Sequence, residues 1–307
     1  MTDAAIALTP PRRRVRDRGA RVRLWAYGML GLVVLGAVWE LYKALGPADG
    51  LVIGEARVLP RTSDLAMPHL WEMASRLAEP VTRAEGARPL WLEVVLAAGL
   101  TLGIAAAGWI VGVVVGIALA LVMQRWRIAE SAMLPWIVLS QTVPLIAFAP
   151  LVRSWGSRIE IGAFEWQDWM SVAVIASYLA FFPVAVGALR GLQAPDRIHL
   201  ELMRTYSVGW RATLMHLRFP AAVPYLLPAL RLAAANAVVG AVVAEVSTGL
   251  QGGIGRLVIQ YAGQASGDPS KAWAPIFGAV ALGLIAAGSV AILGLVFRNY
   301  RRSEEQA

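Results

Sequence analysis

The sequence predicts an all-α fold: a polytopic membrane helical bundle with six transmembrane helices and both termini in the cytoplasm. Hydrophobic residues make up 58% of the 307 residues and charged residues only 16%, whereas a soluble domain is nearer 45–50% apolar and about 25% charged. Six apolar stretches each reach the length of about 20 residues that crosses a bilayer. The formal charge of +8 lies mostly on one side of these stretches.

The six stretches are taken as the spans. Prolines inside a span are tolerated where neighbouring helices satisfy the freed backbone groups, so the prolines of the third, fourth and fifth stretches favour a packed bundle. The third stretch is expected to be broken by Pro135, Pro144 and Pro150. The predicted spans are Leu24–Leu45, Leu90–Met123, Ala132–Val152, Trp169–Leu189, Ala221–Val246 and Trp273–Phe297.

The distribution of arginine sets the orientation. Cytoplasmic segments near the spans carry an excess of Lys and Arg, and the leader and the loop between the fourth and fifth spans are rich in arginine. This places both termini in the cytoplasm. The expected segments are a basic leader (1–23), the first span (24–45), an outer segment (46–89), a core of five spans (90–300) with a cytoplasmic loop (192–220), and a cytoplasmic tail (301–307).

The first span has a secretory signal as its alternative. It follows a basic leader, but the stretch is longer than a signal's apolar region and no clear cleavage site follows it. We therefore predict an uncleaved anchor. In the outer segment after it, the pattern of Asp64–Leu77 predicts an amphipathic helix on the membrane surface.

Residues typical of an enzyme or a metal site are few. The chain has no cysteine, and its three histidines fall in different loops without metal-ligand spacing. The cluster Gly252-Gly253-Ile254-Gly255 lacks the Gly-Lys-Ser/Thr of a phosphate-binding loop, and we interpret it as a tight turn. We expect no metal, no cofactor, no catalytic residue and no ATP hydrolysis by this chain alone. The positive charge is explained by topology, without nucleic acid as a partner.

Glycines recur four residues apart along the second span. Gly99 and Gly103 are followed by Gly108, Gly112 and Gly116, and small residues at this spacing let another backbone approach closely. The alternative is the ordinary content of an alanine- and glycine-rich chain. In either case this helix is expected to pack against protein along one face, which would also permit contact with a second subunit.

Three ionisable residues lie inside the apolar stretches, where charges are costly and usually face a bundle interior or a water-filled path. Glu40, near the outer end of the first span, is expected to reach the interface. Arg231 and Glu245 lie within about 40° on one helix face and about 21 Å apart along it, too far to pair. Together they are candidates for the two ends of a polar face that lines a path. The alternative for Glu245 is a polar contact that fixes helix packing.

The cytoplasmic loop before the fifth span is too polar to cross a membrane and too regular for a linker. Asp196 favours a helix start, a break falls around Ser207–Gly209, and Pro220 is expected to stop a second helix. The loop is thus predicted to be helix, turn, helix. Such an element docks to a cytoplasmic partner or lies on anionic lipid through its arginines, and the pattern alone favours neither.

This loop resembles the EAA loop of ABC importer permeases, which reads Glu-Ala-Ala, three residues, Gly, nine residues, Ile-x-Leu-Pro. Here Glu201 opens the motif and Pro220 closes it, while other residues replace the two alanines. Ser207 stands at the position of the glycine, which normally permits positive φ. The turn therefore either changes its geometry or pivots at Gly209.

Flanking motifs resemble one branch of that family, the nitrate, sulfonate, taurine and vitamin-precursor permeases. The resemblance covers about Leu59–Tyr300 and implies a type I importer fold. Asp49–Arg57 and Ser157–Asp168 look longer than is usual for the branch. The matching motifs are Val143–Leu151, Phe181–Pro183 with Gly191-Leu192, Leu230-Arg231, Ala244-Glu245 and Gly253–Gly255.

The resemblance implies a non-enzymatic permease subunit in the inner membrane of a prokaryote. A substrate-binding protein outside would deliver a small solute, and a separate cytoplasmic ATPase would hydrolyse ATP. A second permease subunit in a homodimer and membrane lipid would be further partners. A vitamin precursor, pyrimidine- or riboflavin-like, is favoured over sulfonate or nitrate. The implied ATPase-coupling residues are Glu201, Arg204, Thr205, Tyr206, Ser207, Gly209 and Trp210, and the implied path or gating residues are Arg231, Glu245, Pro144 and Pro150.

Two other classes of protein remain as alternatives. An ion-coupled secondary transporter or channel would work without an ATPase, so co-purification with an ATPase separates it from the permease. A membrane-embedded enzyme would need clustered His, Cys or intramembrane acid pairs, which the sequence lacks.

Overall fold

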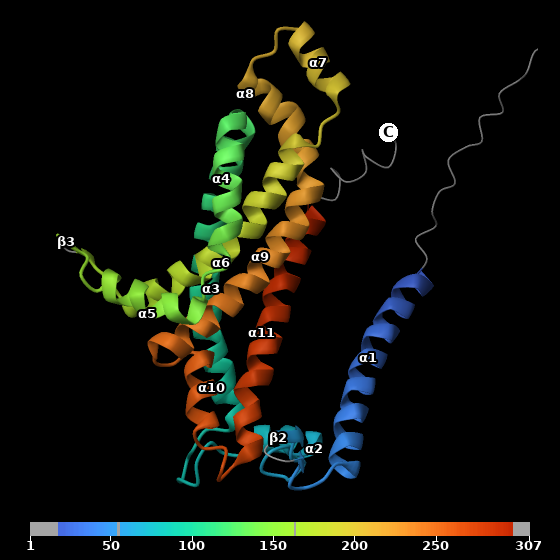
Figure 1. Cartoon of the computed structure of the whole chain (residues 1–307), viewed down its shortest axis with the longest axis vertical. Coiled ribbons are helices and arrows are strands. Elements are labelled where there is room, and N and C mark those ends of the chain that lie inside the picture. The colour runs from blue at the N-terminus through green and yellow to red at the C-terminus, as the bar shows by residue number, and fades with distance from the viewer. Residues whose placement is uncertain (1–17, 54–55, 163, 297–307) are drawn as a thin grey trace, which may run out of the picture. The chain divides into compact units, whose positions relative to one another are not determined.

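The computed structural model describes residues 18–53, 56–162 and 164–296. Most of the predicted leader and the whole predicted tail lie outside these residues. The chain forms two compact units, Met1–Trp71 and Glu72–Ala307, which are drawn in Figure 1. The boundary between them falls inside the predicted outer segment.

The first unit is built on one apolar helix. Helix α1 (Arg18–Leu45) contains the candidate span Ala26–Leu45, and no residue in the apolar window of that span is buried. Such a surface suits lipid, which solvates apolar side chains that water would not. A short hairpin follows, in which β1 (Leu51–Ile53) pairs antiparallel with β2 (Ala56–Leu59).

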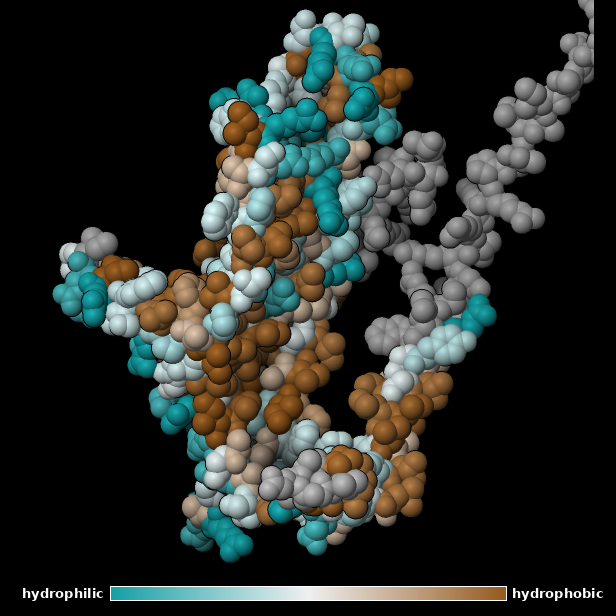
Figure 2. Space-filling view, viewed as in Figure 1, coloured by the Kyte–Doolittle hydropathy of each residue, from teal (hydrophilic) through white to brown (hydrophobic). Residues whose placement is uncertain are grey.

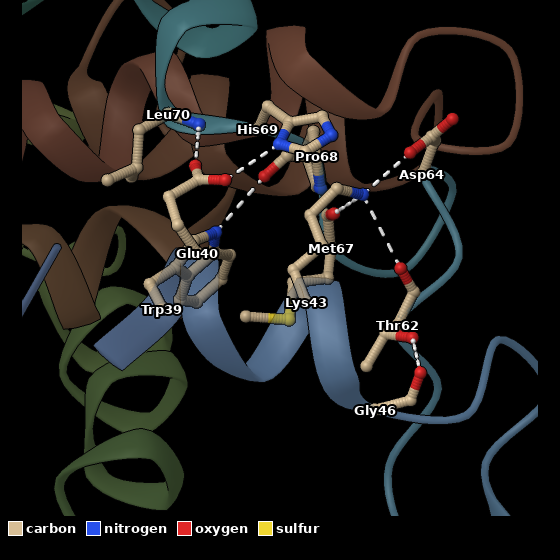
Figure 3. A network of polar contacts seen from close by, with 10 residues as sticks. All are labelled: Trp39, Glu40, Lys43, Gly46, Thr62, Asp64, Met67, Pro68, His69 and Leu70. Carbon is tan, nitrogen blue, oxygen red and sulfur yellow. Dashed lines mark hydrogen bonds and ion pairs between the residues drawn. The ribbon is translucent and has the colours of Figure 1, made fainter. Parts of the chain in front are cut away.

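A network of polar contacts holds the end of α1 (Figure 3). The buried ammonium group of Lys43 donates to Asp64 Oδ1 at 2.6 Å and to the carbonyl oxygens of Met67 at 2.6 Å and Thr62 at 3.4 Å. Three acceptors satisfy the three donors of an ammonium group, so the charge is buried without an orphaned proton. The hydrogen bond from Lys43 holds the pKa of Asp64 below its usual value.

Glu40 belongs to the same network. Its carboxylate accepts the Leu70 backbone N–H at 2.8 Å and lies 2.7 Å from His69 Nδ1. The ring of His69 stacks on Trp71, with the centroids 4.1 Å apart. Glu40 therefore ties α1 to His69 and to the first residue of α2, contacts that the sequence did not predict.

The second unit is a helical bundle. Its long helices are α3 (Leu90–Arg125), α6 (Asp168–Gln193), α9 (Phe219–Thr248) and α11 (Pro269–Val296). They pack side by side around a core of small and branched residues (Figure 1). Apolar residues cover the middle of this unit and polar residues gather at its end near α7, as a bilayer-spanning bundle requires (Figure 2).

The small-residue face of α3 is packed within the chain. A Cβ atom added to Gly108, Gly112 or Gly116 would lie only 2.5 to 2.8 Å from alanine and valine side chains of α6. The predicted close packing is therefore present, but its partner is α6. This part of the face is not available to a second subunit, whereas Gly99 and Gly103 have no atom within 4 Å of such a Cβ.

The predicted third span is two helices. Helix α4 (Arg127–Ser140) and α5 (Leu145–Gly156) meet at 102°. The break falls at Pro144, because proline has no N–H and disfavours helical backbone in the residue before it. Breaks at Pro135 and Pro150 were wrong predictions. Both prolines lie inside helices, each losing one hydrogen bond without ending its helix.

The loop predicted to be cytoplasmic contains α7 (Arg197–Thr205) and α8 (Trp210–Thr213), which continues through a π-helical turn (Leu214–Arg218) into α9. Contrary to the prediction, Pro220 does not stop the second helix, and a continuous helix runs from Trp210 to Thr248. The Phe219 N–H bonds the Leu214 carbonyl, five residues back. This wider turn precedes the proline and relieves the crowding that its ring causes in a regular α-helix.

Three further elements complete the second unit. Helix α2 (Leu70–Ala78), which begins in the first unit, is shorter than the predicted Asp64–Leu77, since Pro68 precedes it. Strands β3 (Glu160–Ile161) and β4 (Phe164–Glu165) form a small hairpin in the long α5–α6 connection. Helix α10 (Ile254–Ala262) follows the glycine turn and buries Ile254, Leu257 and Tyr261. The pattern predicted only a turn there.

Candidate functional site

The turn between α7 and α8 keeps the geometry of a glycine turn without a glycine. Ser207 has φ of 53°. Its N–H bonds the Arg204 carbonyl at 2.8 Å, and the Val208 N–H bonds the Met203 carbonyl at 2.9 Å, which is the Schellman helix end. The pivot thus stays at Ser207, while Gly209 has φ of −65°.

Helix α7 has no buried residue: Leu200 and Met203 are partly covered, and its other residues are exposed. Ile198, Leu202 and Tyr206 recur every four residues and therefore form one apolar stripe. They are 71%, 52% and 74% exposed. Glu201 lies beside this stripe and is exposed, as are Arg204 and Thr205. The predicted coupling residues thus form one open surface.

Helix α8 and the π turn, which connect α7 to the bundle, contact the ends of α3 and α6. The guanidinium of Arg125, at the end of α3, lies 5.5 Å from the ring centroid of Trp210, within cation–π range. Arg218 Nη1 donates to the Leu192 carbonyl at 2.6 Å. These contacts join α8 and the π turn to the ends of α3 and α6, so α7 projects from a defined base.

Glu245 lies at the other end of α9, fully buried. Its carboxylate accepts the Thr101 hydroxyl at 2.8 Å and the Gly255 N–H at 2.8 Å. The Thr101 oxygen in turn accepts the Ile254 N–H at 2.9 Å. Glu245 and Thr101 thus join α9 to α3 and to the first turn of α10.

Two glycines make this junction possible. A Cβ on Gly253 would lie 2.3 Å from Glu245 Cδ, and a Cβ on Gly255 would lie 2.4 Å from the Val242 carbonyl oxygen. The motifs Ala244-Glu245 and Gly253–Gly255 include the carboxylate and both glycines, but nothing in the sequence identified Thr101 as the partner of Glu245. That residue is 144 positions from Glu245 and lies among ordinary apolar residues of α3.

The predicted polar face of α9 has different neighbours at its two ends. Arg231 lies beside α11, where a Cβ on Gly294 would be 3.3 Å from Nη2. Its buried Nε has no hydrogen-bond partner among the described residues. Glu245 faces α3 and α10 instead. The structure does not bring the two residues together.

The two remaining predicted path residues lie on the bent third span. Pro144 caps the start of α5, and Pro150 lies within it. Both are exposed in this chain. Pro150 borders a hollow that also contains an ion pair, Arg153 with Asp168. Among the described residues, no group of three or more His, Asp or Glu side chains has the arrangement of a metal site.

These features define a class of protein: a multi-pass helical membrane protein with an exposed helical element at one end. Residues 112–302 match the family described as binding-protein-dependent transport system inner membrane component. Because the match covers more than half of the chain, the protein belongs to this family of ABC transporter permeases. The predicted family, the all-α membrane bundle and the inner-membrane location are confirmed, and the chain is a membrane subunit of a transporter whose ATPase is a separate subunit.

Relatives from several bacteria point to the same branch. The chain is 32% identical over 208 residues, 66% of this chain and 77% of the relative, to the formylaminopyrimidine transport permease protein ThiX of Halalkalibacterium halodurans. It is 27% identical over 294 residues, 95% and 94% of the two chains, to the putative aliphatic sulfonates transport permease protein SsuC of Bacillus subtilis. The riboflavin transport system permease protein RibX of Chloroflexus aurantiacus is 28% identical over 134 residues, 44% and 46% of the two chains.

A solved structure supports the fold. The crystal structure of an amino acid ABC transporter with histidines matches with a TM-score of 0.51 and 18% identity, over 69% of this chain and 94% of that one. At this identity the likeness shows the arrangement of helices alone.

Proposed function

We propose that this chain is the permease through which a small solute, delivered by a substrate-binding protein, enters the cytoplasm, and that α7 with α8 is the surface that the ATPase engages. The importer class follows from the family. The observation that carries the ATPase contact is the exposed stripe of Ile198, Leu202 and Tyr206 on a fixed base.

The exposure of α7 and its position at the end of the bundle support a docking role over lipid binding. A membrane-surface helix buries its apolar face in the acyl boundary, whereas α7 extends from the bundle at the end where polar residues gather (Figures 1 and 2). Aromatic anchors such as Tyr206 are enriched at the centres of protein interfaces. A fixed base also limits the entropy lost on binding.

The path is proposed to run beside the bent third span, with Pro144 and Pro150 on its wall and Arg231 near one end. Glu245 is proposed to act on the path indirectly, by holding the α9–α10 turn against α3. A second copy of the chain is proposed to complete the path, through surfaces other than the glycines that α6 already covers.

A vitamin precursor remains the favoured solute. Two of the relatives carry names that specify formylaminopyrimidine and riboflavin transport, and a third is named for aliphatic sulfonates. The substrate class is argued further below from the chain's own side chains.

The ATPase contact is tested by reversing the charge of Glu201. We expect Glu201→Arg to abolish co-purification of the ATPase and solute-stimulated ATP hydrolysis, because it places a cation beside the docking stripe. The matched control is Glu160→Arg on β3, also exposed and outside α7. Intact coupling and uptake in the Glu201 variant would overturn the docking surface. Uptake without any ATPase would favour a secondary transporter.

A further inference from the structure

We propose that the hollow where α5, α6 and α9 meet is a transit site for an uncharged polar solute, and that it disfavours oxyanions. This inference rests on the proposed function. The hollow measures about 370 Å³, within the range of small-molecule sites. Its lining residues are Pro150, Arg153, Ser154, Ser157, Asp168, Ser247 and Thr248.

The guanidinium of Arg153 is already occupied. Nε donates to Asp168 Oδ1 at 3.0 Å and Nη2 to Oδ2 at 2.7 Å, and Nη1 donates to the Thr248 carbonyl. The paired donors of arginine are the group that recognises carboxylates, sulfonates and phosphates in a bidentate manner. In this chain the carboxylate of Asp168 already accepts the paired donors of Arg153.

An anionic solute would therefore meet two obstacles. It would have to displace Asp168 from Arg153, and it would then lie beside the charge of that carboxylate. Unpaired and like charges are the means by which a site rejects a competing ligand. With Arg153 and Asp168 neutralising each other, the hollow carries no net charge from its lining residues.

The remaining polar groups suit hydrogen bonding. The hydroxyls of Ser157 and Ser247 donate to the carbonyls of Ser154 and Val243 at 3.1 and 2.8 Å, so their lone pairs remain as acceptors. The Ser154 hydroxyl has no hydrogen-bond partner among the described residues and offers a donor as well. Pro150 adds an apolar wall. A heterocycle or amide with both donors and acceptors matches this set.

The site draws on a stretch that the sequence predicts to be longer than is usual for the branch, Ser157–Asp168. The long stretch Ser157–Asp168 contains the β3–β4 hairpin and supplies both Ser157 and Asp168 to the hollow. A connection outside the long helices can change the solute without changing the bundle, because loops carry specificity on a fixed scaffold.

The test uses the absence of cysteine, which makes Ser154→Cys the single thiol of the full-length chain. Its rate of maleimide labelling is measured in membrane vesicles with thymine, an uncharged pyrimidine, or with methanesulfonate. At about four times its dissociation constant, thymine is expected to slow labelling about fivefold, since four-fifths of the sites are then occupied. Methanesulfonate is expected to have no effect. Ser75→Cys on α2 is the control for labelling away from the hollow.

A second substitution tests the role of the charge. Adding Asp168→Asn leaves Arg153 without its anion and is expected to let methanesulfonate protect the thiol, with at least about tenfold tighter binding. Asp168→Glu, which keeps the charge, is expected to continue excluding it. Protection by methanesulfonate with Asp168 intact, or no protection by thymine, would overturn the proposal. Either result would leave ATPase coupling through Glu201 intact, so it is distinguishable from a failure of the proposed function.

Discussion

Two places in the chain favour glycine for different reasons: the position of Ser207 between α7 and α8, and the positions of Gly253 and Gly255 at the start of α10. At the first place, the family pattern expects glycine and the chain has Ser207, exposed and at φ of 53°. At the second place, Gly253 and Gly255 leave no room for a Cβ beside Glu245 and Val242. The position of Ser207 requires a left-handed backbone conformation, whereas the positions of Gly253 and Gly255 require the absence of a side chain.

This difference between a conformational and a steric requirement explains why glycine can be replaced at position 207 but not at positions 253 and 255. A non-glycine residue in the left-handed region costs about 1–2 kcal/mol, which a helix-end motif and a small polar side chain can offset. A Cβ atom overlapping a backbone carbonyl has no such remedy unless the helices separate. The exposed surface therefore tolerates sequence change, while the buried junction does not.

The largest effect is expected from Gly255→Ala. The added methyl group would lie 2.4 Å from the Val242 carbonyl oxygen and 2.8 Å from Glu245 Cβ, so α10 would have to move away from α9. We expect a loss of about 3 kcal/mol in the free energy of unfolding, at the upper end for overpacked cores. Thermal unfolding in detergent measures it.

The control for that experiment is Gly263→Ala at the far end of the same helix. Its Cβ would make only ordinary contacts, the nearest at 3.5 Å from the Gln260 carbonyl. We expect a change within about 0.5 kcal/mol. Equal effects of the two substitutions would show that space at the junction is not the constraint.

A smaller loss is expected from Glu245→Ala. It leaves the Thr101 hydroxyl and the Gly255 N–H without their acceptor, at a cost of about 2 kcal/mol. Glu245→Gln keeps one acceptor oxygen and should recover part of the stability measured by thermal unfolding. If Glu245→Ala unfolds like the parent chain but abolishes uptake, the residue contacts the path directly.

The smallest effect, and one of opposite sign, is expected from Ser207→Gly. Glycine adopts positive φ without the Cβ penalty, but its greater freedom in the unfolded chain offsets part of the gain. We expect α7 to become more stable by about 0.5 kcal/mol, measured as slower amide exchange across Arg197–Thr205. Faster exchange would mean that the serine side chain stabilises the turn.

The spans were predictable because each is a long apolar run, and the observed helices begin and end within a few residues of most predicted bounds. The missing N–H of proline predicted the break at Pro144, but the same argument predicted breaks at Pro135 and Pro150, which lie inside helices. The continuation through Pro220 was not predictable, since it depends on a π turn that no residue type specifies. The partners of Glu245 were also hidden, because Thr101 meets it only through the packing of α3 on α9.

The uninterrupted helix from Trp210 to Thr248 has a mechanical consequence. Its 39 residues would extend about 58 Å as a straight rod, reaching from α8 to the buried Glu245 junction. Pro220, Pro224 and Pro228 each lack the N–H of a backbone hydrogen bond, and all three lie in the half of the helix nearest α8, so bending concentrates in that half. The half that ends at Thr248 contains no proline, so it moves as one stiff segment that carries the Glu245 junction with it.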